Sequence, residues 1–221
     1  MAGSAALFTL SGLDGLYEVD SYATDKAGNN ETAHSTSAYL DNTPVATIAA
    51  PTATQYGHSD ILTLIYSVSD GSGSGVQSSA PTMDGKTTLQ DGTPVANNLV
   101  IYLLTQMSVD THTFAVASLD NLNNAGTQSV TFSIVVTPDS IKGDVTQFLQ
   151  GGAIKNSGEA TSLLAKLDAA AAARARGECS TAANLYQAFI NELMAQSGKG
   201  VDPAAATIML SDAQYLITHC P

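Results

Sequence analysis

Two stretches of the sequence, 95 residues apart, can be aligned with each other without a gap. Tyr17–Asn29 reads YEVDSYATDKAGN, and His112–Asn124 reads HTFAVASLDNLNN. In this alignment Asp25 falls on Asp120, and the two stretches end on the same residue type. An Asp that follows a strand and precedes a turn can accept hydrogen bonds from the N–H groups of that turn. The two stretches therefore predict the same Asp-capped turn twice.

Each of these turns is expected to need a positive φ angle at one residue. Gly28 aligns with Asn123, and Gly and Asn are the two residues that enter the left-handed region most cheaply. Each copy then continues into a second strand, over residues 36–40 and 129–136. Two strands joined by such a turn form a hairpin. A spacing of 95 residues suits β-sandwich domains, which have about 100 residues.

Composition and charge both change near Thr137. Residues 1–137 carry 12 acidic and 2 basic residues and are rich in Thr, Ser, Val, Tyr, Asn and Gly, which is a strand-and-turn composition. Residues 138–221 carry 8 acidic and 6 basic residues and are rich in Ala, Leu and Gln, which favours helices. We therefore predict a domain boundary at this point, with an all-β part before it and an all-α part after it.

The all-β part contains further strand and turn signals between the two copies. Residues 61–68 read as one buried strand, 99–104 are a second apolar run, and turns are expected at 70–75, 81–85 and 90–94. Residues 44–137 are thus predicted to form one complete β-sandwich, whereas 1–43 hold only the last strands of a preceding one. A lone hairpin is marginal in water, so we expect the missing strands either upstream in a longer chain or in another chain.

The all-α part, residues 138–221, is predicted to be a small four-helix bundle. The expected helices cover residues 140–149, 158–176 and 181–196, and a fourth begins at Pro203, with Asp139 and Asp202 as the N-caps of the first and last. Apolar residues recur at helical spacing on each of them. The expected inward residues are Ile141, Val145, Phe148, Leu149, Leu163, Leu167, Ala170, Ala171, Leu185, Phe189, Ile190, Leu193, Met194, Met209, Ala213 and Leu216.

Both cysteines lie in this predicted bundle. Cys179 is near the start of the third helix and Cys220 is at the end of the fourth, and these two ends meet when neighbouring helices are antiparallel. We therefore predict a disulfide that closes a loop of about 40 residues and contributes roughly 4 kcal/mol in the chain-entropy treatment. Two free thiols in the core are the competing interpretation. A disulfide would place the protein in an oxidising compartment.

The β part resembles bacterial immunoglobulin-like repeats. The stretch 22–29, YATDKAGN, is similar to the Y-x-A-x-D-x-A-G-N signature that precedes the last strand of such repeats. The stretch 69–76, SDGSGSGV, resembles their S-D-x-x-S-G-V segment with a glycine inserted. In the second copy, residues 120–124 read DNLNN in place of D-x-A-G-N. The resemblance implies an immunoglobulin-like β-sandwich, preceded by a partial one.

The helical part resembles the FIMAH domain, a module found at the C-terminal ends of large secreted bacterial enzymes that include glycosidases and peptidases. The residues that carry this resemblance are GAIKN at 152–156, SLLAKL at 162–167, AFINELMAQSGK at 188–199 and DAQYL at 212–216. The resemblance covers nearly all of residues 138–221. It implies an accessory role in a modular protein and supplies no catalytic residues.

Several functions are disfavoured by composition and motif spacing. The net charge of −12 argues against binding to nucleic acid or to anionic membranes, and no apolar run is long enough to span a bilayer. The stretch 71–75, GSGSG, lacks the spacing of a nucleophile elbow. We identify no catalytic residues and expect a protein that is not an enzyme and needs no organic cofactor. The four histidines show no zinc or triad spacing and are expected to be exposed or half-buried: His34, His58, His112 and His219.

Calcium is the one ligand suggested by the residues themselves. Asp25, Asp70 and Asp120 lie in predicted turns beside backbone carbonyl groups, and Ca²⁺ prefers hard oxygen ligands. A bound cation would also relieve the net charge of −10 on residues 1–137. The competing interpretation is that these three side chains only cap their turns.

Three functions follow as hypotheses. In the first, the chain is a non-catalytic accessory region, spacer plus anchoring module, of a secreted or cell-surface modular protein such as an extracellular hydrolase. Its partner would be a protein or glycan at the cell surface, and its signal peptide would lie outside this chain. In the second, residues 1–43 drive self-association into oligomers or filaments by strand exchange. In the third, the sandwich binds carbohydrate through exposed aromatic residues such as Tyr56 or Tyr102.

Overall fold

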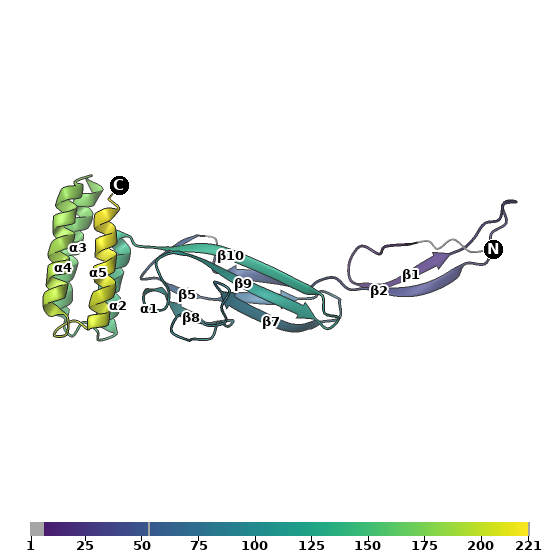
Figure 1. Cartoon of the computed structure of the whole chain (residues 1–221), viewed down its shortest axis with the longest axis horizontal. Helices are drawn as coiled ribbons and strands as arrows, with labels where there is room; N and C mark the ends of the chain where they lie inside the picture. The colour runs from purple at the N-terminus through teal and green to yellow at the C-terminus, as the bar shows by residue number, and fades with distance from the viewer. Residues whose placement is uncertain (1–6, 53, 221) are drawn as a thin grey trace. The chain divides into compact units, whose positions relative to one another are not determined.

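The computed structural model describes residues 7–52 and 54–220 of the chain, which form two compact units. Figure 1 shows the strands and helices coloured in chain order. The first unit comprises residues 7–48, 66–81 and 115–129. The second comprises residues 49–52, 54–65, 82–114 and 130–220. A β-rich region followed by a helical region is the arrangement that composition predicted.

The strands of the β-rich region form several small sheets. The strand bounds are β1 Gly15–Ser21, β2 His34–Leu40, β3 Val45–Ala50, β4 Gln55–Gly57, β5 Ile61–Thr63, β6 Ile65–Ser69, β7 Val76–Met83, β8 Val100–Tyr102, β9 Thr111–Asp120 and β10 Ala125–Val135. One sheet has the order β4-β10-β9-β7, and three further pairs are β1-β2, β3-β6 and β5-β8. A short helix, α1 Leu103–Gln106, follows β8.

The long hairpin β9–β10 supplies much of the β core. Phe114 and Val116 on β9 are fully buried, and Phe132 and Ile134 on β10 are at most 2% exposed. Buried and less buried residues alternate along β9 and along residues 131–135 of β10, as expected when one face of a sheet packs on a core. The parallel pairing of β10 with β4 brings residues 55–57 beside 133–135.

The first predicted turn joins β1 and β2 and is closed by Asp25. Its Oδ1 atom accepts hydrogen bonds from the backbone N–H groups of Ala27 (2.8 Å) and Asn29 (2.9 Å). Its Oδ2 atom accepts from the side-chain amide of Asn29 (2.8 Å). Gly28 takes a φ of 91°, the left-handed conformation that the alignment predicted.

The second turn, between β9 and β10, repeats this pattern bond for bond. Oδ1 of Asp120 accepts from the backbone N–H groups of Leu122 and Asn124, both at 2.8 Å, and Oδ2 accepts from the side-chain amide of Asn124 at 2.8 Å. Asn123 has a φ of 68°. The internal repeat is therefore confirmed as a shared turn, although only the Asp and the final Asn are identical between the copies.

Two details of the β region differ from the sequence-based expectation. The run 61–68 forms two strands, β5 and β6, which belong to different two-stranded sheets and are separated by Leu64. Within this run Leu62 and Leu64 are buried, whereas Tyr66 and Val68 are only partly buried. The turn expected at 81–85 begins later, because Pro81 is the sixth residue of strand β7 and the positive φ angles fall on Asp84 and Gly85.

The helical region contains four long helices. Their bounds are α2 Pro138–Gln150, α3 Ser157–Ala175, α4 Cys179–Gln196 and α5 Pro203–Thr218. Asp202 caps α5 as predicted. The cap of α2 is Thr137 and not Asp139, because Thr137 and Ser140 each accept the other's backbone N–H in a capping box. Pro138 then occupies the first helical position, where no N–H is needed.

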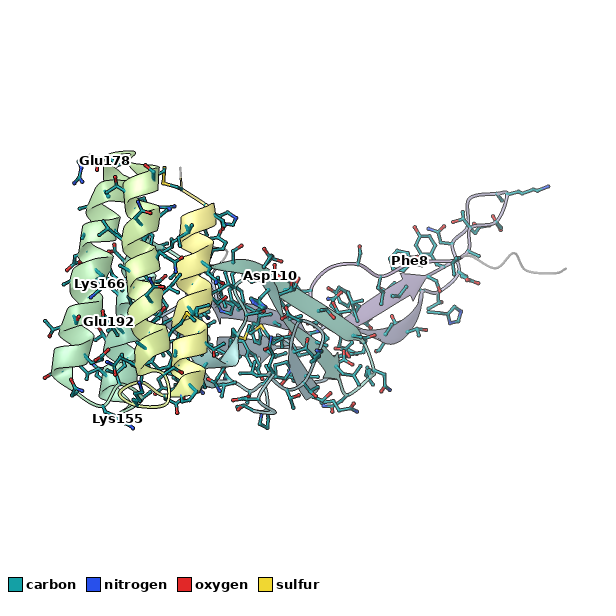
Figure 2. The ribbon with its side chains drawn as sticks, turned by 60° about the vertical axis from the view of Figure 1, so that its left-hand side comes forward. Phe8, Asp110, Lys155, Lys166, Glu178 and Glu192 are labelled. Atoms are coloured by element: carbon teal, nitrogen blue, oxygen red, sulfur yellow. A yellow bond between two sulfur atoms is a disulfide. The ribbon has the colours of Figure 1, made fainter. Side chains whose placement is uncertain are left out.

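The helices pack around one apolar core. The fully buried side chains that line it include Ile141, Val145, Leu163, Leu167, Phe189, Leu193, Met209 and Ala213. Met194 was expected in this core but is 64% exposed, and Tyr186, which is 1% exposed, lies in it instead. Position 194 follows Leu193 by 100° around α4 and so leaves the inward stripe. On the outside, Lys166 of α3 and Glu192 of α4 form an ion pair (Figure 2).

A disulfide joins Cys179 to Cys220, which confirms the predicted pairing. The two Cα atoms are 5.8 Å apart and the residues are 41 positions apart in sequence. The bridge connects the first residue of α4 to the second residue after α5, where the two antiparallel helix ends meet. It therefore ties the C-terminal end of the chain to the bundle.

Candidate functional site

Three carboxylates meet in the first unit at the ends of separate elements. Asp41 follows β2, Asp70 follows β6, and Asp120 is the last residue of β9. One oxygen atom from each lies within 4.8 Å of the others. Among the described residues this is the group of acidic, His or Cys side chains whose spacing suits a metal ion.

Asp120 is held in place by the turn that it caps. Its side chain is completely buried. Burial opposes its ionisation, but the hydrogen bonds from Asn124 and from the backbone of Leu122 and Asn123 outweigh that effect and lower the pKa of this carboxyl group. Asp120 is therefore a carboxylate and offers negative charge to the cluster.

Backbone and amide donors fix the other two carboxylates beside Asp120. Oδ1 of Asp41 accepts the N–H of Ser74 (2.9 Å), and Oδ2 of Asp70 accepts the N–H of Gly75 (2.7 Å). The side-chain amide of Asn124, which bonds to Asp120, also donates to the backbone carbonyl of Asp41 (3.3 Å). The glycine-rich stretch 71–75 is thus a turn that supplies N–H groups to this cluster.

Of the three predicted calcium ligands, the structure brings Asp70 and Asp120 together, and the third member of the group is Asp41 and not Asp25. Asp70 and Asp120 are in the cluster, whereas Asp25 is exposed and caps its own hairpin turn. Hydrogen bonds from Asn29, Ala27 and Gly28 lower the pKa of Asp25. Asp41 was missed, because it lies in the short linker before Pro44 and carries no repeat or turn signal that would single it out.

A second group of polar side chains is buried in the second unit. His58, in the loop between β4 and β5, lies with its Nδ1 atom 2.6 Å from Oδ2 of Asp212 on α5. Asp144 on α2 lies beside Asp212 and is completely buried. The expectation that His58 is exposed or half-buried is wrong, since it is 6% exposed.

Burial and the nearby charge of Asp212 raise the pKa of Asp144 to about 9. Neither carboxyl oxygen of Asp144 receives a hydrogen bond from a donor among the described residues. A contact with Asp212 can be a hydrogen bond only if one of the two carboxyl groups keeps its proton. Asp144 is therefore neutral at neutral pH and carries a proton beside Asp212, which in turn faces His58.

His112 and the two tyrosines considered for carbohydrate binding differ in how far they are buried. His112 is also buried, contrary to expectation, and its Nδ1 lies 2.8 Å from Oδ2 of Asp84. The Tyr56 ring packs edge-on against Phe132, and its hydroxyl accepts the N–H of Thr52. Tyr102 is 51% exposed.

The search for membrane-spanning segments was restricted to the described residues. Within them, no helix combines the length and the apolar character needed to cross a bilayer.

Comparison with known proteins assigns the helical region to a family. Residues 138–218 match the model of the FIMAH domain. No curated protein matches the chain.

Two solved structures share low overall similarity with the chain. The fibronectin(III)-like modules of Clostridium thermocellum CbhA align with a TM-score of 0.31 and 14% identity, over 55% of this chain and 63% of that one. An engineered protein, target OR128 of the Northeast Structural Genomics Consortium, aligns with a TM-score of 0.30 and 17% identity, over 42% of this chain and 20% of that one. The chain thus spans less than two thirds of the length of either structure.

The raised pKa of Asp144 predicts that stability falls as pH rises. In the unfolded chain this group has its ordinary pKa of 3.8, so folding takes up a proton between that value and about 9. The free energy of unfolding should then decrease with pH in this window, by at most about 1.4 kcal/mol per pH unit. Urea unfolding at pH 6, 7 and 8 measures this slope.

Asp144→Asn keeps a donor toward Asp212 but cannot ionise. It should flatten the slope between pH 6 and 8 and make the variant more stable than the wild type at pH 8. Asp168→Asn, which changes a carboxylate that is 67% exposed, is the matched control and should keep the wild-type slope. Equal slopes in Asp144→Asn and wild type would contradict a neutral Asp144.

Proposed function

We propose that this chain is a non-catalytic accessory region of a secreted or cell-surface modular bacterial protein. The β-rich region acts as a spacer, and the helical region is an anchoring or interaction module for a protein or glycan at the cell surface. The observation that carries this proposal is the match of residues 138–218 to the FIMAH domain, over the segment that the structure folds into α2 to α5.

The disulfide supports an extracellular location. Bridges such as Cys179–Cys220 form and persist in oxidising compartments and are rare in the cytosol. The net charge of −12 and the low share of charged residues, 13%, also suit a surface carried by uncharged polar side chains outside the cell.

Within the second unit, helix α2 contacts the loop between β4 and β5. The side-chain amide of Gln147 on α2 donates to the backbone carbonyl of Ser59. Gly143 on the same helix faces Ser59 so closely that a Cβ atom there would lie 2.3 Å from its hydroxyl oxygen. Together with the contact between His58 and Asp212, these contacts would transmit a pull on the helical module directly to the spacer.

In this proposal, the catalytic activity of the whole protein, such as an extracellular hydrolase, resides in a domain outside these 221 residues. The full chain should show no turnover on polysaccharide or peptide substrates. It should co-sediment with at least one insoluble surface component among peptidoglycan, cellulose, xylan and chitin, or with intact bacterial cells. Turnover by the purified chain, or its failure to sediment with every one of these materials, would contradict the proposal.

Substitution of an exposed tyrosine tests whether the helical module or the β-rich region binds the insoluble material. Tyr102→Ala removes an exposed ring of the β-rich region and should leave sedimentation unchanged. Tyr22→Ala, on the hairpin, is a control of the same type. A loss of at least about tenfold in affinity for a glycan with Tyr102→Ala alone would favour a carbohydrate-binding sandwich instead.

A second function, assembly by strand complementation, is favoured by the uneven burial of the two related hairpins. The β9–β10 hairpin buries Phe114 and Phe132 to within 2% of full burial. On the first hairpin and its flanking segment, Leu13 is 83% exposed and Leu16 is 73% exposed. A second copy of the chain could cover this surface with its own hairpin.

The mass in solution distinguishes the two functions. An accessory region should be a monomer near 22.7 kDa by size exclusion with light scattering, and Leu16→Glu should leave this mass unchanged. A discrete oligomer or a polymer that Leu16→Glu converts to monomer would establish assembly through the hairpin. Leu122→Glu, at an exposed residue of the second turn, is the control that should not affect assembly.

A further inference from the structure

The carboxylates of Asp41, Asp70 and Asp120 carry a charge that their surroundings do not neutralise. Carboxylates with oxygen atoms within 4.8 Å of one another repel when they are ionised, the more so because Asp70 and Asp120 are buried. None of the ion pairs among the described residues includes any of the three. Their neutralising partner is therefore not a Lys, Arg or His side chain of this described structure.

One carboxylate oxygen of the cluster is buried without a hydrogen-bond partner among the described residues. Asp70 is 93% buried, with 7% of its surface exposed, and its Oδ1 atom has no hydrogen-bond partner among the described residues. The Oγ atom of Ser74, on the same turn, is also buried without a partner. A buried carboxylate oxygen without a partner costs stability unless a ligand satisfies it.

Gly73 leaves space between two of the carboxylates. A Cβ atom at this position would lie 2.3 Å from Oδ1 of Asp41 and 2.5 Å from Oδ2 of Asp70. The backbone of Gly73 is outside the left-handed region, so its conformation does not require glycine. The absence of a side chain at this position is therefore needed for space beside the carboxylates and not for the turn.

We propose that Asp41, Asp70 and Asp120 bind one Ca²⁺ ion. The donors are carboxylate oxygens, which hard cations prefer, and the site contains no His or Cys ligand of the kind that Zn²⁺ takes. Each of these carboxylates accepts N–H or amide donors and still has unused lone pairs, most of all at Oδ1 of Asp70. Water molecules would complete the six to eight ligands that Ca²⁺ takes.

A cation at this position would join three segments of the first unit. Asp41 lies in the linker between β2 and β3, Asp70 lies in the turn after β6, and Asp120 is the last residue of β9, where it caps the following turn. The linker already touches the second segment through the hydrogen bond from the N–H of Ser74 to Asp41. Calcium would therefore hold the linker of the first hairpin against both turns.

Calcium titration of the full, metal-depleted chain by calorimetry tests the site. The wild type should bind one Ca²⁺, with a Kd of about 10⁻⁴–10⁻³ M as in other extracellular modules, and should melt at a higher temperature when Ca²⁺ is present. Asp41→Asn keeps an oxygen that can accept from Ser74 and should weaken binding at least about tenfold. Gly73→Ala should weaken it similarly, because the methyl group displaces the carboxylates.

Asp25→Asn is the matched control. It removes a carboxylate charge, as Asp41→Asn does, from a residue that has the turn hydrogen bonds of Asp120 but lies outside the cluster, so calcium binding should be unchanged. Three results would overturn the proposal: no heat and no melting shift up to about 10 mM Ca²⁺, equal weakening by Asp25→Asn and Asp41→Asn, or Mg²⁺ binding as tight as that of Ca²⁺. Circular dichroism of each variant without metal confirms that a loss of binding is not a loss of fold.

Discussion

The arrangement of the first unit depends on the hydrogen bonds that the Asp120 carboxylate accepts within its turn. This carboxylate is completely buried, yet three hydrogen bonds from its own turn keep it ionised. The same turn positions the amide of Asn124, which reaches the linker at Asp41. Asp120 thus closes the hairpin β9–β10 and places negative charge beside two other carboxylates, and Asn124 of the same turn bonds to the linker that precedes β3.

This turn could be predicted from sequence because it is local. A hydrogen-bonded Asp, a residue that tolerates positive φ and an Asn with a side-chain amide lie within five consecutive positions, and the alignment of Asp25 with Asp120 exposes that pattern even where the other residues differ. The helices were predictable for a similar reason. Their apolar spacing and caps are short-range signals, and the disulfide follows once two neighbouring helices are known to be antiparallel.

The parts that sequence did not reveal depend on contacts between distant segments. Asp41 joins the acidic cluster only because the folded chain returns residues 70 and 120 to the same place. Asp144 and Asp212 lie on the inward faces of α2 and α5, where apolar periodicity assigns no role to a carboxyl group. His58 is buried by its pairing with Asp212, 154 positions further along the chain. These side chains respond to charge and burial that only the tertiary structure creates.

The central claim of this account is that the two hairpins share one turn and differ in whether a core covers them. Hydrogen–deuterium exchange of the backbone amides measures this directly. The amides of Leu122 and Asn124 should exchange at least about a hundredfold more slowly than those of Ala27 and Asn29, although both pairs donate to an equivalent Asp. Equal protection of the two turns would contradict the claim, since the hydrogen bonds alone would then account for their stability.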